Sequence, residues 1–134
     1  DRDNLYYASV DGVLYSKDLN TIIRFPINKD VAKYKIPTSV TTIGDASFSD
    51  CKFLKNVDIP DSVTIIGHQA FEWCEFLQDL EIPNSVKTIA EFAFNNCNNL
   101  KEVTYEGTQD EWNSIVSTTG NDSLTKAEIT FIGD

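Results

Sequence analysis

A run of 23 residues recurs three times in this chain without an insertion. The copies are KIPTSVTTIGDASFSDCKFLKNV at residues 35–57, DIPDSVTIIGHQAFEWCEFLQDL at 58–80 and EIPNSVKTIAEFAFNNCNNLKEV at 81–103. A fixed period of this length is typical of a solenoid, in which each coil buries its apolar face only against its neighbours. The repeat therefore predicts a stack of short, similar coils.

The aligned copies share columns of apolar or small residues that we expect to form the core. Each column recurs every 23 residues, and its members in the first copy are Ile36, Val40, Ile43, Ser47, Phe48, Cys51, Leu54 and Val57. The proline after each isoleucine, at Pro37, Pro60 and Pro83, lacks a backbone N–H and should end a strand. The serine two residues further on should bond the turn backbone through its hydroxyl.

The frame LKNVDIPDS at 54–62 fits the leucine-rich-repeat pattern of a short strand followed by a turn. It recurs at 77–85 and 100–108 and, in weaker form, at 31–39, so we count about five coils. A second extended run follows each turn, and segments such as GHQAFEWC at 67–74 should form one or two helical turns. The predicted fold is an α+β repeat solenoid with short parallel strands and short helical turns.

We expect a single domain whose ends differ from its middle. Residues 1–35 should hold an N-terminal β-hairpin and a degenerate coil, residues 36–104 three regular repeats, and residues 105–134 a closing coil and a C-terminal cap. The hairpin is predicted from GVLYS and TIIRF on either side of the polar turn KDLN. Such ends keep the apolar stack from polymerising.

The C-terminal cap is predicted to be a helix followed by a strand. Thr108 should be the helix N-cap, and Glu111 three residues later completes a capping box. Trp112 and Ile115 should then share one helix face, and Gly120 should end the helix. The alternating run KAEITFI is predicted to be a strand that covers the last coil.

Charge and composition exclude several classes of partner. The chain has 11 basic and 21 acidic residues, a net charge of −10, and this field repels nucleic acid and anionic lipid. No apolar run is long enough to insert into a membrane. Because the chain contains no methionine, we interpret it as a piece of a longer protein, with any signal and anchor outside it.

The cysteines and the histidine do not form a recognisable catalytic or metal motif. The three cysteines recur every 23 residues, and we expect free core thiols rather than disulfides or metal ligands. His68 lies in a turn column and should face solvent, whereas Cys74 should point inward, so the two should not form a nucleophile and base pair. We expect no enzyme activity, no cofactor and no metal.

The open face of the strands is the stronger candidate site. Side chains that alternate with the buried ones along the strands should line this face, and they are Lys33, Lys35, Asn56, Asp58, Asp79, Glu81, Glu102 and Thr104. Like charges on neighbouring strands repel each other. The cluster could therefore bind a basic protein patch or a weak Ca²⁺ ion, or it could simply be a solvated face.

Two further features each have two interpretations. Trp73 occupies a column of Asp50 and Asn96, so it should be partly exposed, either as a partner-binding residue or packed on Phe53 and Phe76. The tripeptide NDS at 121–123 fits the glycosylation sequon, to which we assign little weight.

The repeat template I-P-x-S-V-x-x-I-G-x-x-A-F-x-x-C-x-x-L-x-x-V-x resembles the BspA-like, or Treponema pallidum-type, leucine-rich repeats of bacterial and some protozoan surface proteins. The flanking stretches DGVLYSKDLNTIIRFP and YEGTQDEWNSI are similar to segments that accompany such repeats, so the resemblance covers nearly the whole chain. Ala90 and Glu91 depart from the usual glycine position. The resemblance implies secretion or surface display and binding of host or neighbouring-cell proteins, with fibronectin and fibrinogen attributed to relatives.

These observations together predict a monomeric, non-catalytic, extracellular protein-binding or adhesion module of a bacterial surface or secreted protein. The partner, an extracellular or host protein, would be bound through the open strand face. One alternative is a structural spacer, and another is an accessory module of a secreted glycan- or peptide-degrading enzyme. Flanking sequence discriminates these two, because an anchor and more repeats favour the spacer and a catalytic domain favours the accessory module.

Overall fold

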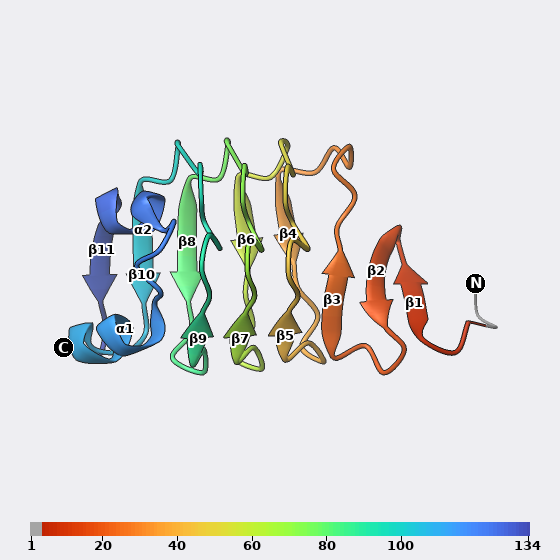
Figure 1. The fold of residues 1–134 in the computed structure, drawn as a ribbon, viewed down its shortest axis with the longest axis horizontal. Coiled ribbons are helices and arrows are strands. Elements are labelled where there is room, and N and C mark those ends of the chain that lie inside the picture. Colours follow the sequence, from red (N-terminus) through yellow and green to blue (C-terminus); the bar gives the residue numbers. More distant parts are fainter. Residues whose placement is uncertain (1–3) are drawn as a thin grey trace.

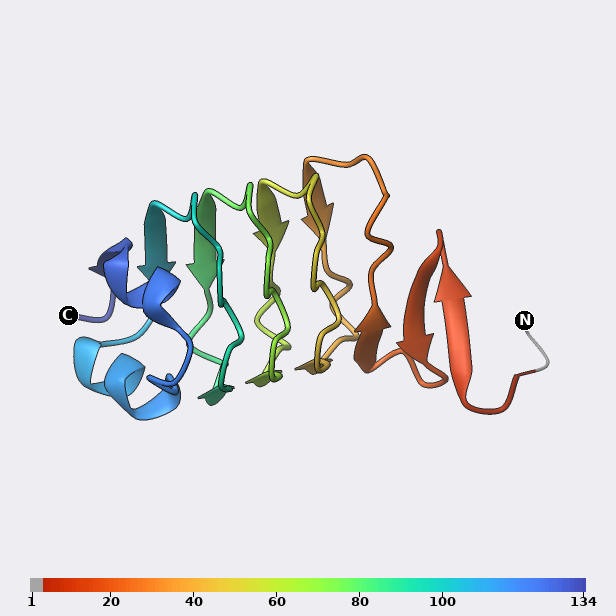
Figure 2. The ribbon, with the colours of Figure 1, turned by 45° about the horizontal axis from the view of Figure 1, so that its top comes forward.

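The computed structural model describes residues 4–134 and is a solenoid with two sheets (Figures 1 and 2). Sheet A has the strand order β1 (Tyr7–Val10), β2 (Val13–Ser16), β3 (Thr21–Arg24), β5 (Thr42–Ile43), β7 (Ile65–Ile66) and β9 (Thr88–Ile89). Sheet B has the order β11 (Glu128–Phe131), β10 (Glu102–Tyr105), β8 (Asp79–Ile82), β6 (Asn56–Asp58) and β4 (Lys33–Lys35). The predicted repeat solenoid is confirmed.

Each regular coil contributes one short strand to each sheet. The chain leaves sheet B at the proline turn, forms a two-residue strand in sheet A and returns through a series of turns. Equivalent residues of successive coils pair in parallel, as Ile43 with Ile66 and Ile66 with Ile89. One sequence period of 23 residues therefore leads from each strand to its neighbour in the same sheet.

The predicted core columns all point inward. A ladder of phenylalanine rings runs through the coils, with centroid separations of 5.2 Å from Phe25 to Phe48, 4.9 Å from Phe48 to Phe71 and 5.0 Å from Phe71 to Phe94. These rings are fully buried. Stacking of this kind adds to the free energy gained by burial.

Only two of the three serines in the column after the prolines form the expected hydrogen bond. Ser39 Oγ donates to the Leu19 carbonyl at 2.9 Å, and Ser85 Oγ donates to the Val63 carbonyl at 2.7 Å. The hydroxyl of Ser62 is buried without a hydrogen-bond partner. The predicted bonding to turn backbone is confirmed for the first and third serines only.

The expected helical turns in the coils are wrong. Residues 67–74 form consecutive turns, and two residues of this segment, Gln69 and Trp73, have left-handed φ angles of 57° and 62°. A left-handed residue every few positions interrupts the helical hydrogen-bond series. Alternate N–H groups of the segment bond to the next coil, as where the Phe71 N–H donates to the Ala93 carbonyl at 2.7 Å. The N–H groups between them close turns within the segment, as where the Ala70 N–H donates to the Gly67 carbonyl.

The N-terminal hairpin is confirmed and extended by one strand. Strands β2 and β3 pair antiparallel as predicted, and β1 pairs antiparallel with β2 around the tight turn Asp11–Gly12. Strand β3 then pairs in parallel with β5. The hairpin is thereby continuous with sheet A of the repeats.

The C-terminal cap contains the predicted helix and strand and one more helix. Helix α1 (Gln109–Ile115) has the complete capping box of Thr108 and Glu111. It ends at Ile115, not at Gly120 as predicted, because Val116 leaves the helix to form a β-bridge with Ile89. Helix α2 (Asp122–Lys126) was not predicted, whereas β11 pairs in parallel with β10 as expected.

Within residues 4–134, the structure contains no helix that is both long and apolar enough to span a bilayer.

Candidate functional site

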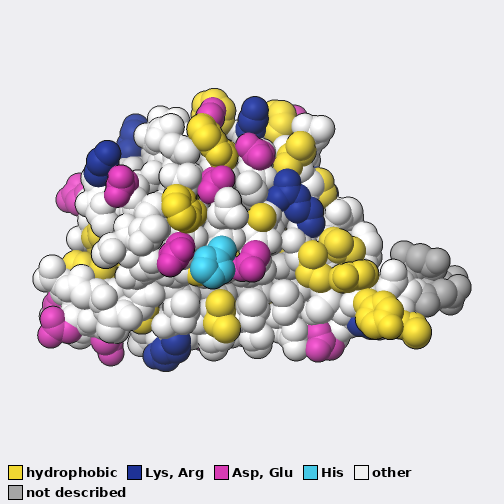
Figure 3. Space-filling model, in the orientation of Figure 1, with side chains coloured by type: hydrophobic (Ala, Val, Ile, Leu, Met, Phe, Trp, Pro, Cys, Tyr) yellow, Lys and Arg dark blue, Asp and Glu magenta, His cyan; other side chains and the backbone are white. Residues whose placement is uncertain are grey.

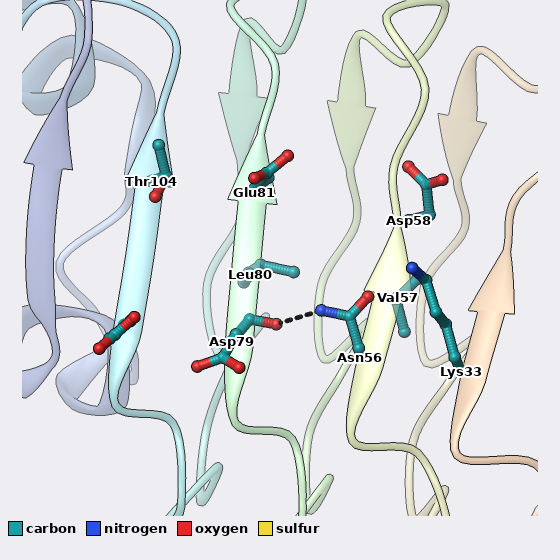
Figure 4. A pocket seen from close by; sticks show the side chains of 9 residues that line it. Lys33, Asn56, Val57, Asp58, Asp79, Leu80, Glu81 and Thr104 are labelled. Atoms are coloured by element: carbon teal, nitrogen blue, oxygen red, sulfur yellow. Dashed lines mark hydrogen bonds between the residues drawn. The ribbon is translucent and has the colours of Figure 1, made fainter.

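The open face of sheet B carries the eight strand side chains predicted from the sequence. In β6 and β8, Val57 and Leu80 are buried, and the residues on either side of them turn toward solvent. Figure 4 shows these side chains projecting from neighbouring strands on one surface. The alternation of inward and outward positions in a strand produces this arrangement directly.

The outward side chains form two rows that run across the strands. The first row joins Lys33, Asn56, Asp79 and Glu102 through paired positions of β4, β6, β8 and β10. The second row consists of Lys35, Asp58, Glu81 and Thr104. Because paired strands lie roughly 5 Å apart, neighbouring carboxylates in a row are close enough to act together on one ligand.

The two rows border a shallow depression of about 360 Å³ on sheet B. All eight predicted residues except Lys35 line it, with Val57 and Leu80 at its floor. Its polar lining and open form suit a protein surface or a polar side chain rather than an enclosed small molecule. The structure thus brings seven of the predicted strand residues into one concave surface.

Charge changes sign along the rows. Both lysines lie on β4 at one edge of sheet B, whereas the carboxylates lie on β6, β8 and β10. Lys33 extends from β4 along β6 (Figure 4), and Asn56 Nδ2 donates to the Asp79 carbonyl at 3.1 Å. This amide links β6 to β8 beside the pairing of Asn56 with Asp79. The open face is therefore basic at one end and acidic over the remainder.

The first row continues to a residue that the sequence interpretation omitted. Glu128 on β11 is exposed and lies opposite Glu102 in the parallel pairing of β10 and β11. The signal was available, because KAEITFI was predicted as a strand and Glu128 alternates with inward-facing neighbours. Asp79, Glu102 and Glu128 therefore form three successive carboxylates on adjacent strands.

The carboxylates do not form a compact metal site. Among residues 4–134, no group of three or more His, Cys, Asp or Glu side chains has the arrangement needed to hold a metal ion. Carboxylates in paired strands point outward side by side, whereas Ca²⁺ requires several oxygen ligands converging at 2.3 to 2.6 Å. The geometry therefore favours a ligand that spreads over the rows.

Trp73 lies away from the eight sheet B residues. It belongs to the turns that return from sheet A to sheet B, and its side chain is 41% exposed, as predicted. Phe53 and Phe76, at 45% and 47%, are exposed in the same part of the coils. Figure 3 shows hydrophobic side chains interspersed with charged ones along the upper edge of the molecule. The predicted partner-binding residues therefore divide between two surfaces.

The three thiols are free and buried, which confirms the predicted core thiols. Cys74 Sγ donates to the Phe48 carbonyl and Cys97 Sγ to the Phe71 carbonyl, both at 3.1 Å, so each thiol bonds to the preceding coil. Burial raises the pKa of Cys51 and Cys97 to about 12 and raises the pKa of Cys74 as well. Thiols protonated at neutral pH are poor nucleophiles and poor metal ligands.

His68 is exposed and Cys74 is fully buried, so the structure separates the two as predicted. The backbone N–H of His68 donates to the Asp45 carboxylate at 2.9 Å, which holds this turn against the preceding coil. A base must lie within hydrogen-bond reach of its nucleophile. These two residues therefore do not form a catalytic pair.

Asn121 has a structural role that the sequence interpretation missed. Its side chain is fully buried, where Oδ1 accepts from the Phe94 N–H at 3.0 Å and Nδ2 donates to the carbonyls of Ala90 at 3.0 Å and Ser117 at 2.7 Å. The sequon interpretation considered only surface chemistry. A glycan on this nitrogen is incompatible with the observed packing.

Solved structures of bacterial leucine-rich-repeat proteins are similar to this fold. A leucine-rich repeat protein from Eubacterium ventriosum is 31% identical with a TM-score of 0.76, over 79% of this chain and 28% of that one. A leucine rich cell surface protein from Faecalibacterium prausnitzii is 25% identical with a TM-score of 0.60, over 88% and 44%. This chain therefore spans less than half the length of either protein.

A third structure, from Bacteroides capillosus, shares the fold over nearly its whole length. It is 24% identical with a TM-score of 0.73, and the match covers 93% of this chain and 99% of that one. A search of the curated proteins finds no significant match. The family model of the BspA type leucine-rich repeat region matches residues 25–132 in six copies, against the count of about five coils predicted. The chain belongs to the BspA-type leucine-rich-repeat family.

Proposed function

We propose that this chain is a non-catalytic, extracellular protein-binding module that recognises a basic patch of a protein partner through the open face of sheet B. The observation that carries the proposal is the first carboxylate row, Asp79, Glu102 and Glu128, held in register on three parallel strands. Like charges directly opposite each other destabilise a sheet. A partner with lysines and arginines would relieve this repulsion on binding.

The rows suit a protein partner for three reasons. Their neighbouring charges lie within the Debye length of about 8 Å at physiological ionic strength, so a partner experiences their combined field. The lysines of β4 at the opposite end favour one orientation of the partner over its reverse. Rigid parallel coils also present this surface with little loss of conformational entropy on binding.

Two further considerations support the non-catalytic and extracellular parts of the proposal. The thiols are buried and the single histidine is exposed and away from them, so these residues supply no activated nucleophile. One similar solved structure is a leucine rich cell surface protein, and the repeat template of this chain resembles the repeats of bacterial surface proteins. A surface-displayed module with a charged, rigid face is suited to adhesion.

The test is capture of host and cell-wall proteins by the immobilised chain, compared with a variant neutralised on the open face. The open-face variant is D58N/D79N/E81Q/E102Q. We expect the wild type to retain basic proteins that elute with salt and the variant to lose them at least tenfold. Salt-dependent elution distinguishes charge-based binding from adsorption on exposed aromatic side chains.

A matched control removes the same charge from other surfaces. D30N/D61N/E91Q/D110N changes three aspartates and one glutamate that are exposed outside the open face. This control should retain the captured proteins at near wild-type levels. Equal loss in both variants would show that net charge alone, and not the rows, is responsible. Capture of nothing by the wild type would favour the spacer.

A further inference from the structure

The edges of the two sheets differ in how well they are protected against pairing with another strand. Strand β4, at one edge of sheet B, carries Lys33 and Lys35, and β11 at the other edge carries Glu128. Strand β9 of sheet A is covered by its bridge to Val116. Charged side chains and covering segments are the usual protection of an edge. Strand β1, with the sequence YASV, has no charged residue.

The hydrogen-bonding groups of β1 that face outward can be assigned from its register. Val10 pairs with Val13 across the two-residue turn, and Ala8 pairs with Tyr15. The Lys17 N–H donates to the Tyr6 carbonyl at 3.0 Å, so the residues bonded to β2 are the even-numbered ones. The N–H and C=O groups of Tyr7 and Ser9 therefore point away from β2. The Tyr7 N–H donates to Asn4 Oδ1 at 3.0 Å, whereas the Ser9 N–H and the two carbonyls face outward toward any added strand.

The side chains beside this edge are apolar and exposed. Leu5 and Tyr6 are 80% and 73% exposed, and Val10 is 49% exposed. Cross-strand pairing places Ala8 and Val10 on the same face as the buried residues Val13 and Tyr15. The face that forms the core elsewhere in sheet A thus continues onto β1 without a covering layer.

We infer that β1 is a homodimerisation edge at which a second copy of this chain pairs antiparallel about a twofold axis through Ala8. In this register Tyr7 of one copy lies opposite Ser9 of the other, and the two pairs exchange four backbone hydrogen bonds. In two of these bonds the Tyr7 N–H leaves Asn4 Oδ1 and donates to the Ser9 carbonyl of the other copy. Val10 lies opposite Tyr6, so their exposed apolar surfaces cover each other. Both six-stranded sheets A join into one continuous sheet.

Charge favours a second copy at this edge over contact elsewhere on the surface. Two copies with a net charge of −10 each repel one another. The segment NLYYASV at 4–10 contains no side chain that is charged at neutral pH, and in the proposed register Asp11 faces Leu5 rather than another carboxylate. A dimer differs from the monomer that the sequence predicted. The dimer interface is independent of the proposed function of sheet B.

The first test is sedimentation of the wild type, S9P and S9T over a range of concentrations. Proline at this position removes an outward N–H that β2 does not use, and edge strands tolerate it. We expect a reversible dimer for the wild type and S9T, and at least tenfold weaker association for S9P. The unfolding midpoint of S9P should equal that of the wild type when both are diluted to the monomer. A wild type that stays monomeric up to its solubility limit, or an S9P that still dimerises, would overturn the inference.

The second test reads the register from disulfide formation. A8C places two thiols opposite each other with Cα atoms about 4.5 Å apart, within the disulfide range. V10C places them about 13 Å apart, four residues out of register, which is too far. The native thiols are buried and should not interfere. Mild oxidation should cross-link A8C and leave V10C monomeric on a denaturing gel, and the reverse pattern would contradict the proposed register.

Discussion

The middle coils and the C-terminal cap satisfy the same backbone groups by different means. In the coils, the Phe48 N–H donates to the carbonyl of Ala70, and the Phe71 N–H donates to that of Ala93. Phe94 has no further coil, and its N–H donates instead to the side-chain oxygen of Asn121. The Asn121 side chain therefore takes the place of the carbonyl that the next coil would supply to Phe94.

The difference shows how a solenoid distributes its stability. Each inner coil gains hydrogen bonds and ring contacts from both neighbours because the sequence repeats. At the end, those contacts come from residues that occur once, such as Asn121 and Ser123, whose Oγ accepts from the Cys97 N–H at 3.1 Å. At repeated positions, the effect of a substitution on stability should therefore follow the burial of the side chain. At cap positions, it should depend on whether a specific polar group is lost.

The largest expected effect is on the phenylalanine ladder. Phe71→Ala removes a ring stacked between Phe48 and Phe94 and should lower the free energy of unfolding by roughly 3 to 5 kcal/mol, measured by denaturant unfolding. The matched control is Phe76→Ala, whose side chain is about half exposed and should cost well under this amount. Similar losses in both variants would contradict the distinction between ladder and surface.

The cap should lose stability when the Asn121 side chain is removed. Asn121→Ala leaves the Phe94 N–H and two carbonyls without their partner and should cost about 2 to 3 kcal/mol in thermal or denaturant unfolding. Asn98→Ala, at an exposed position, should change stability by no more than about 0.5 kcal/mol. A loss below about 1 kcal/mol for Asn121→Ala would mean that the cap does not depend on this side chain.

The thiol ladder predicts a loss of stability at high pH. Burial raises the pKa of Cys97 to about 12 in the folded chain, from about 8.5 when unfolded. The folded state therefore binds this proton more tightly, and the resulting stability is complete below about pH 8.5 and is lost as pH rises toward 12. Between pH 8 and pH 10, the free energy of unfolding should fall by about 1 to 2 kcal/mol less in Cys97→Ala than in the wild type.

Denaturant unfolding at several pH values measures this difference. Cys51→Ala should behave in the same way, because burial raises the pKa of Cys51 also to about 12. Parallel pH dependence of the wild type and both variants would show that the thiols do not titrate with unfolding.

The smallest expected effect is a gain in stability at a left-handed turn position. Ala46 has a φ of 54°, which an L-residue with a Cβ adopts at a cost. Ala46→Gly should therefore stabilise the chain by about 0.5 kcal/mol in denaturant unfolding. Ala70→Gly, at a buried position without a left-handed φ, should destabilise it by about 1 kcal/mol. Destabilisation by both changes would contradict the expected relief of strain.

Much of the regular fold could be predicted because each coil repeats the same burial requirement. The columns that contain Phe48 and Leu54 recur every 23 residues. An apolar residue at the same position of every copy indicates that this position is buried in each coil. The outward strand residues followed from simple alternation with the buried ones, which placed Asp79 and Glu102 correctly. The capping box of Thr108 and Glu111 was predictable because it depends on local spacing alone.

The remaining features depend on contacts that local patterns do not report. Gln69 and Trp73 adopt left-handed φ angles because their neighbours bond to the next coil, and neither residue type indicates this in the sequence. Helix α1 ends early because Val116 pairs with Ile89, which is 27 residues earlier in the chain. Asn121 could be mistaken for a surface sequon because two of its three hydrogen-bond partners, Phe94 and Ala90, are also distant in sequence.

The same repetition that builds the core also builds the acidic rows on the open face of sheet B. The most direct test is the affinity of one captured basic protein for the wild type, D79K/E81K and the control D61K/E91K, measured by titration at constant ionic strength. Binding through the rows predicts that D79K/E81K loses affinity at least tenfold while the control stays within about twofold of the wild type. Unchanged affinity in D79K/E81K would contradict the proposed role of this face.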